Sequence, residues 1–266
     1  MHSKIPKSLE SADFSQVEYL FTDIDDTLTA QGQLPSHSYG ALWKLAEMGI
    51  KLIPVTGRPA GWCEMIARMW PVEAVVGENG GFYFQLDENK MTRVYDQNNE
   101  LRGKNSLRLQ NLQTQIKSTH PRILLASDQF CRQLDLAIDI CEDIHPPMSK
   151  EEVRSIVKIC KDAGASVKVS SIHINTWFGD FNKAKMVKRY LSDELQEDLD
   201  SESTQNKCVF IGDSPNDEPL FEAFKNSVAV ANISEFLEEL EHPPKFITED
   251  ESAAGFMELA TQLMMG

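Results

Sequence analysis

The chain has 266 residues, of which 41% are hydrophobic and 25% are charged, and its formal net charge is −15 at pH 7. This composition is ordinary for a soluble globular protein, and no apolar run approaches the length that crosses a bilayer, so we expect no membrane partner. The excess of acids would repel nucleic acid, which is therefore not an expected partner, and an anionic substrate would need a metal ion or well-placed cations.

The N-terminal segment and the cysteines indicate a cytoplasmic protein. Residues 1–16 are polar and lack the apolar stretch of a secretory signal, so we interpret them as a short leader into the first strand. The five cysteines form no CxxC pair, and their odd number argues against a zinc site or a disulfide framework. We therefore expect buried thiols in a reducing cytoplasm.

The first part of the chain alternates apolar runs with amphipathic stretches, which predicts the order β-α-β-α-β. Residues 17–22 are almost continuously apolar or aromatic, the pattern of a strand that is buried on both faces of a parallel sheet. Further strands are predicted at 50–55 and 72–76, and helices at 36–48 and 59–70.

The last part of the chain returns to this alternation after a long insertion. Strands are predicted there at 208–211, 228–230 and 246–247, and helices at 183–199, 217–224 and 253–264. Between about 82 and 180 the pattern changes to hairpin-like strands and two helices, 107–119 and 150–163, which indicates an inserted module with its own small core. The sequence thus predicts an α/β fold with a doubly wound sheet, whose ligands bind at the carboxyl ends of the strands.

Acidic side chains follow the first predicted strand directly, in the run DIDDTLT at 23–29. Asp23 and Asp25 start out on the same face of an extended chain, while Ile24 points into the core. Two neighbouring carboxylates repel unless a cation or a proton separates them. One of them can then hold Mg²⁺ and attack as an anion, while the other carries the proton that a leaving group needs. The alternative interpretation is an acidic turn after a strand.

Groups that bind phosphate follow the second predicted strand, in the run TGRP at 56–59. Thr56 offers a hydroxyl, Gly57 an amide that an anion can approach closely, and Arg58 a guanidinium. The helix that starts near Pro59 is expected to turn its positive end toward the same anion. Alone, such a tripeptide is a weak signal.

A second acidic run, GDSPND at 212–217, follows the strand predicted at 208–211. Asp213 would complete a Mg²⁺ site with Asp23, because Mg²⁺ favours carboxylate and carbonyl oxygens together with waters. The alternative is a helix N-cap, which Ser214 or Asn216 could provide.

Three further side chains complete the candidate site. Asp217 could hold a metal-bound water or a backbone amide, and Asn216 could orient the phosphate or Lys183. A single lysine is more often a solvated surface charge. Lys183 stands out because it opens a helix that returns to the core, in a chain that also has strand-end acids, a strand-end threonine and a final acid pair.

Taken together, these motifs resemble those of haloacid dehalogenase-like phosphatases, and specifically the Cof-type subclass, IIB. The matching runs are DIDDTLT at 23–29, TGRP at 56–59, ENGG at 78–81, NK at 182–183 and GDSPND at 212–217. The resemblance implies a Rossmann-like parallel-sheet core, residues 1–81 and 183–266, with an inserted α+β cap domain for substrate recognition, residues 82–182. It also implies a Mg²⁺-dependent hydrolase that acts on a small phosphorylated metabolite.

The resemblance also implies residue roles. Asp23 is the nucleophile that is phosphorylated, and Asp25 is the general acid and base. Thr56 and Lys183 are phosphate ligands, and Mg²⁺ lies on Asp23, the Asp25 carbonyl and Asp213, with Asp217 nearby. The insertion lies between Thr56 and Lys183, whereas phosphomutase relatives carry theirs before the threonine motif. A mutase is therefore disfavoured, although transfer to an acceptor other than water stays open.

The cap offers the only guide to the substrate. In 133–140 and 171–177 apolar residues alternate with others, which predicts strands with one buried face. The residues expected to pack on the cap helices are Leu134, Leu136, Ile138, Ile140, Ile172 and Ile174. The opposite face, with Ser171, His173, Asn175 and Trp177, could look down on the catalytic edge, and the alternative is that these residues merely face solvent.

Polar groups beside one aromatic platform suit a phosphorylated sugar or polyol, which related Cof-type enzymes commonly accept. A nucleotide, pyridoxal phosphate, flavin mononucleotide or a phosphorylated disaccharide are alternative substrates. A signalling receiver and a phosphatase-like binding protein without activity are rival functions, but a receiver lacks such a cap and every expected catalytic position is occupied. The assembly is expected to be a monomer or a homodimer.

Overall fold

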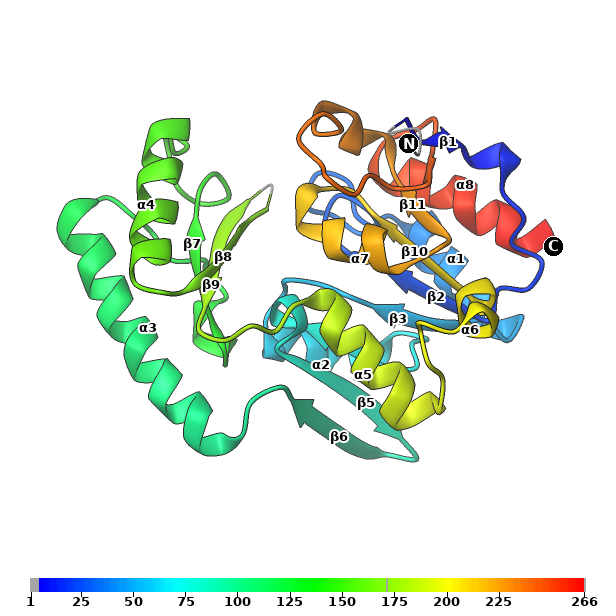
Figure 1. Ribbon diagram of the computed structural model, residues 1–266, viewed down its shortest axis with the longest axis horizontal. Coiled ribbons are helices and arrows are strands. Elements are labelled where there is room, and N and C mark those ends of the chain that lie inside the picture. Colours follow the sequence, from blue (N-terminus) through cyan, green and yellow to red (C-terminus); the bar gives the residue numbers. More distant parts are fainter. Residues whose placement is uncertain (1–4, 171, 266) are drawn as a thin grey trace.

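The computed structural model describes residues 5–170 and 172–265. Over these residues the largest sheet has six strands, all parallel, and its edge strands are short. In spatial order the strands are β1 (Lys7–Ser8), β12 (Phe246–Ile247), β11 (Ser227–Ala229), β10 (Cys208–Gly212), β2 (Tyr19–Thr22) and β3 (Lys51–Pro54). The doubly wound α/β core predicted from the sequence is confirmed (Figure 1).

Helices cover both faces of this sheet because successive strand residues point to opposite sides. Leu20 packs in one buried cluster and Phe21, the next residue, packs in the other. The first cluster includes residues of α1 (Ser36–Glu47), α2 (Ala60–Met69) and α8 (Ser252–Met265). The second includes residues of α5 (Lys183–Leu195) and α7 (Glu218–Ala223), while α6 (Glu202–Lys207) leads into β10.

Two antiparallel sheets belong to the middle of the chain. One consists of β4 (Val75–Gly77), β5 (Phe82–Asp87) and β6 (Lys90–Tyr95), and the other of β7 (Asp135–Asp139), β9 (His173–Trp177) and β8 (Ser166–Val169). The helices α3 (Asn99–Thr119) and α4 (Lys150–Asp162) pack on the second of these sheets, on its outer side in Figure 1. The division into a core and a cap at residues 81/82 and 182/183 stays a prediction.

Three regions differ most clearly from the prediction. Helix α3 begins at Asn99, because the Asn98 side chain accepts a hydrogen bond from Leu101 N and caps a polar first turn that has no apolar periodicity. Part of the expected leader is a strand, since Lys7 and Ser8 pair with β12. Helix α5 ends at Leu195, where Gln196 adopts the left-handed conformation. No helix among the described residues is long and apolar enough to cross a membrane.

The expected division of the cap strands into two faces is wrong in part. Both faces of β7 are buried, since Asp139 is also fully buried and accepts hydrogen bonds from four backbone N–H groups of the turn that follows. Trp177 is no aromatic platform, because it stacks on Phe181 within a buried cluster. Ile172 lies at the candidate pocket and not in the cap core, and Ser171 lies outside the described residues.

The side chain of Glu78 joins the core to the cap. Glu78 follows β4, is fully buried and has a positive φ of 42°. Its carboxylate accepts hydrogen bonds from Ala60 N at the start of α2 (3.0 Å) and from the N–H groups of residues 133–135, at 2.6–3.2 Å. One side chain therefore satisfies buried donors from two segments that are distant in the sequence.

The Glu78→Gln substitution should reduce the free energy of unfolding by at least about 2 kcal/mol, because the new amide would present N–H groups to backbone N–H groups. Urea unfolding measures this effect. The matched control is Glu64→Gln, which removes a carboxylate from the surface ion pairs with Arg68 and Arg93 and should cost less than about 1 kcal/mol. Equal losses in the two variants would contradict a joining role for Glu78.

Candidate active site

The carboxyl ends of three neighbouring strands bring the predicted motifs to one edge of the sheet. In the parallel register Thr22 pairs with Ile211 of β10 and with Pro54 of β3. The residues that follow these strands, Asp23, Asp213 and Thr56, must therefore lie near one another. Asp23 N donates to Ile211 O at 2.9 Å, which fixes the first acid beside the strand that carries the second.

A buried cluster of opposite charges lies at this edge. Lys183 Nζ donates to Asp23 Oδ1 at 2.8 Å and to Asp217 Oδ1 at 2.7 Å. Only 2% of the Lys183 side chain is exposed, and Asp217 is fully buried. Asn182 places the lysine there, since its side chain caps α5 by accepting a hydrogen bond from Lys185 N.

Asp23, Asp213 and Asp217 also have the geometry of a metal site. One carboxylate oxygen from each lies within 4.8 Å of the others, and all three residues are buried. Three carboxylates against one ammonium leave an excess of negative charge away from water, which a divalent cation would compensate. Oxygen donors without sulfur or imidazole suit Mg²⁺, so these residues fit the expected ion.

Asp217 resolves one alternative that the sequence left open. Its Oδ2 accepts a hydrogen bond from Asp213 N at 3.1 Å, so it holds a backbone amide in addition to Lys183. Gly212 permits this contact, because a Cβ atom there would lie 2.4 Å from Asp217 Oδ2. The role of Asp217 toward a metal-bound water stays a prediction.

Burial has the largest single effect on the pKa of each of Asp23, Asp213 and Lys183. It raises the pKa of Asp23 to about 7, with further increases from Asp217 and Asp25 and an opposing effect of Lys183. Burial, Asp217 and Asp23 likewise raise the pKa of Asp213 well above its ordinary value. For Lys183 burial alone would lower the pKa, but Asp217 and Asp23 outweigh it and the pKa is raised. The lysine is therefore a permanent cation.

Arg58 binds the second acid of the first motif. Its Nη2 donates to Asp25 Oδ1 at 2.7 Å and its Nε to Asp25 Oδ2 at 2.9 Å, while its guanidinium carbon lies 4.5 Å from the centre of the Trp62 ring. Thr56 is fully buried, and its hydroxyl accepts a hydrogen bond from Arg58 N. The expectation that the start of α2 faces an anionic ligand is wrong for Ala60 N, which donates to Glu78.

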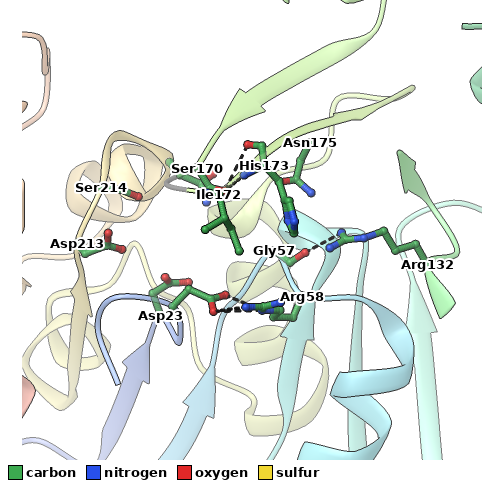
Figure 2. Close-up of a pocket in the computed structure, with 12 residues that line it drawn as sticks. Asp23, Gly57, Arg58, Arg132, Ser170, Ile172, His173, Asn175, Asp213 and Ser214 are labelled. Carbon is green, nitrogen blue, oxygen red and sulfur yellow. Dashed lines mark hydrogen bonds and ion pairs between the residues drawn. The ribbon is translucent and has the colours of Figure 1, made fainter. Parts of the chain in front are cut away.

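A pocket connects this edge with the cap (Figure 2). Its core lining includes Asp23, Asp25, Gly57, Arg58, Asp213, Ser214 and Asn216, and its cap lining is Arg132, Ser170, Ile172, His173 and Asn175. The predicted substrate residues of both parts thus lie around one pocket. Its volume is about 30 Å³, which holds about one water. A metabolite can enter only when the cap or its side chains move.

Acids hold His173 and Asn175, two polar cap side chains of the pocket. His173 Nε2 lies 3.0 Å from Glu142 Oε2, and Asn175 Nδ2 donates to Asp135 Oδ2 at 3.0 Å. Burial lowers the pKa of His173, with a further decrease from Arg132 and an opposing effect of Glu142. His173 therefore acts as a neutral hydrogen-bonding group at neutral pH.

Sequence reasoning missed Arg132. Its Nη1 donates to Gly57 O of the core at 3.0 Å and to Asp135, and its Nε donates to Asp128 Oδ1 at 3.0 Å. A possible signal was the arginine between two acids at spacings of four and three residues, next to an apolar run. Without the fold, that spacing is equally typical of a solvated helix face.

Comparisons with known proteins identify the family and the fold of the chain. A family model described as haloacid dehalogenase-like hydrolase matches residues 20–120 and 149–258. A search of curated protein sequences gives no match. The family match covers the core part of the candidate site, including the first acidic run, the Thr56 motif, Lys183 and the second acidic run, whereas Arg132 lies between the matched ranges.

Several solved structures share the fold. A protein of Thermoplasma acidophilum aligns with a TM-score of 0.72 and 16% identity over 94% of this chain and 100% of its own. The sucrose-phosphatase of Synechocystis, solved with sucrose and phosphate, aligns with a TM-score of 0.63 and 15% identity over 94% of this chain and 98% of its own. The C-terminal domain of trehalose-6-phosphate phosphatase from C. albicans aligns with a TM-score of 0.67 and 15% identity over 94% of each chain. At such identities the likeness establishes the fold alone.

The raised pKa values of Asp23 and Asp213 predict that Mg²⁺ stabilises the protein more as the pH rises. A raised pKa means that the metal-free fold favours the protonated acid. For Asp23 this contribution to stability is present below about pH 4 and is lost as the pH rises through about 7, and for Asp213 it is lost in the same direction. Mg²⁺ competes with these protons. The Mg²⁺-induced increase in Tm should therefore be larger at about pH 8 than at about pH 6.

Thermal unfolding with and without Mg²⁺ at the two pH values tests this dependence. The Asp213→Asn variant is the control and should lose most of the Mg²⁺ effect at both pH values, because it lacks one of the carboxylates. A Mg²⁺ effect that is equal at both pH values, or larger at the lower one, would rule out these acids as the ligands.

Proposed function

The chain belongs to the haloacid dehalogenase-like hydrolases, and from that premise we propose that it is a Mg²⁺-dependent phosphatase that hydrolyses a small phosphorylated metabolite through a phosphoryl group on Asp23. The family match, which covers both core segments, confirms the resemblance of the motifs and the expectation of a hydrolase. The observation that carries the proposal is the buried contact of Lys183 with Asp23 and Asp217 beside Asp213.

Lys183 supports a nucleophilic role for Asp23. It binds Oδ1 and leaves Oδ2 without a hydrogen-bond donor among the described residues, so Oδ2 can attack phosphorus. The new bond joins Oδ2 to phosphorus while the bond from phosphorus to the leaving oxygen breaks. The fixed ammonium then offsets negative charge that would otherwise accumulate among three acids and a phosphate.

Asp25 supplies the proton that the leaving oxygen needs, and water completes the reaction. In the second step the water oxygen attacks phosphorus, its proton passes to Asp25, and the bond to Asp23 breaks. Both oxygens of Asp25 accept from Arg58 in this structure. At least one of them must be released for proton transfer, so a bound phosphate has to compete with Asp25 for Arg58.

Mg²⁺ would be held by Asp23 and Asp213, with Asp217 beside them, and when bound it would neutralise charge on the phosphoryl oxygens. The backbone carbonyl of Asp25, the Thr56 hydroxyl and the side chain of Asn216 are the further groups that we assign to the metal and the phosphate. Asp25 and Asn216 line the pocket, which supports their part of this assignment.

We assign a phosphorylated sugar or polyol as the substrate class. Two of the similar structures are a sucrose-phosphatase and a trehalose-6-phosphate phosphatase. The cap side of the pocket carries Ser170, His173 and Asn175, whose side chains have the donors and acceptors that hydroxyl groups need, and its aliphatic lining residue is Ile172. No Phe, Tyr or Trp is among the described residues that line the pocket, so a flat aromatic base or ring would have only His173 and the guanidinium groups of Arg58 and Arg132 to stack on.

Hydrolysis of p-nitrophenyl phosphate tests the reaction independently of the substrate. The Asp23→Asn variant should have no turnover, because the amide cannot attack, and Asp25→Asn should be slower by about 10²–10⁴, the usual value of general acid–base catalysis. The control is Asp26→Asn, which changes the third acid of the same run and should retain most of the activity. Substantial turnover by Asp23→Asn, with deamidation excluded by mass spectrometry, would refute the covalent route.

A further inference from the structure

Two buried polar atoms next to the pocket lack hydrogen-bond partners among the described residues. They are Nη2 of Arg132, a donor, and Oδ2 of Asp128, an acceptor. The Arg132 side chain is 0% exposed and that of Asp128 is 10% exposed, so bulk water does not satisfy them. Buried polar atoms without partners are rare in folded proteins and need an explanation.

The two atoms belong to groups that already bind each other. Arg132 Nε donates to Asp128 Oδ1 at 3.0 Å. Because Nε and Nη2 share one edge of the planar guanidinium, Nη2 faces the side on which Asp128 lies. The remaining nitrogen, Nη1, is engaged with Gly57 O and with Asp135, so the arginine cannot rotate to satisfy Nη2 elsewhere.

Arg132 lines the pocket opposite the catalytic edge (Figure 2). Asp128 approaches the same pocket through Arg58, whose Nη1 lies 3.6 Å from Asp128 Oδ2, too long for a hydrogen bond. The unpartnered donor and acceptor are therefore on the cap side, where the leaving group of a phosphate bound at Asp23 must lie.

The chemistry of the two atoms selects the group that fits between them. When the side chains around the pocket move, a hydroxyl can accept from Arg132 Nη2 and donate to Asp128 Oδ2. A second carboxylate or phosphate would face Asp128 as a like charge, and an apolar group would leave both atoms unsatisfied. We infer that Arg132 and Asp128 form a recognition site for a hydroxyl group of the leaving alcohol.

This inference rests on the proposed phosphatase function. It assigns to Arg132 and Asp128 the discrimination between a hydroxylated leaving group and other leaving groups. Arg132 also couples recognition to closure, because the same guanidinium holds Gly57 O of the core. Substrates that lack the hydroxyl leave a buried charge pair unsatisfied, which is the strongest form of discrimination against an analogue.

The test compares glucose 6-phosphate, fructose 6-phosphate and glycerol 3-phosphate with cyclohexylmethyl phosphate, which has a six-membered ring but no hydroxyl group. For the wild-type protein, kcat/KM should be at least about tenfold higher for the best hydroxylated substrate, the value of a hydrogen bond to a charged group. If p-nitrophenyl phosphate is hydrolysed but cyclohexylmethyl phosphate matches the best hydroxylated substrate, the site is refuted while the phosphatase proposal survives. No hydrolysis of any phosphate refutes both.

Two variants assign the preference to these residues. Arg132→Lys keeps the positive charge but loses the planar group with several N–H donors. Asp128→Asn keeps the shape of the side chain but replaces one acceptor oxygen with an amide donor. In each, the ratio of kcat/KM for the best hydroxylated substrate to that for cyclohexylmethyl phosphate should fall at least about tenfold. The control Arg122→Lys, in the surface pair with Glu152, should leave the ratio unchanged. An unchanged ratio in either folded variant would overturn the assignment.

Discussion

The structure depends on the burial of one lysine among three carboxylates at the edge of a parallel sheet. Taking these charges out of water is costly, and the cost is offset only by close pairing. Lys183 pairs with Asp23 and Asp217 at once, and Asp217 in turn holds the backbone of Asp213. A divalent cation would compensate the remaining excess of negative charge, and the positions of Asp23 and Asp217 depend directly on the lysine.

The cap is tied to this edge by a second set of buried charges. Glu78 binds N–H groups of both parts, and Arg132 of the cap binds Gly57 O, next to Thr56. Arg58 extends from the core toward the cap and lies 3.6 Å from Asp128. A movement of the cap therefore changes the surroundings of Arg58 and, through it, those of Asp25.

Most of the fold and of the core site could be predicted from local sequence patterns. The strand-end acids could be found because the carboxyl ends of parallel strands meet, so Asp23 and Asp213 had to be neighbours once the strands were recognised. The sequence analysis included Glu78 only as part of the ENGG run at 78–81, and it did not single out Arg132. Their partners come from distant segments, and no spacing in the chain encodes which backbone N–H or carbonyl group a buried side chain will meet. Trp177 was misjudged because alternation identifies the two faces of a strand but does not show what covers the second face.

The central claim is that Asp23 carries the phosphoryl group during turnover. The most direct measurement is to quench the protein with acid while it hydrolyses p-nitrophenyl phosphate, reduce it with borohydride and map the peptides by mass spectrometry. A phosphorylated aspartate is reduced to homoserine, so the account predicts homoserine in place of Asp23 in the peptide that contains residues 19–29. Reduction at another residue, or none in a sample quenched during rapid turnover, would contradict it.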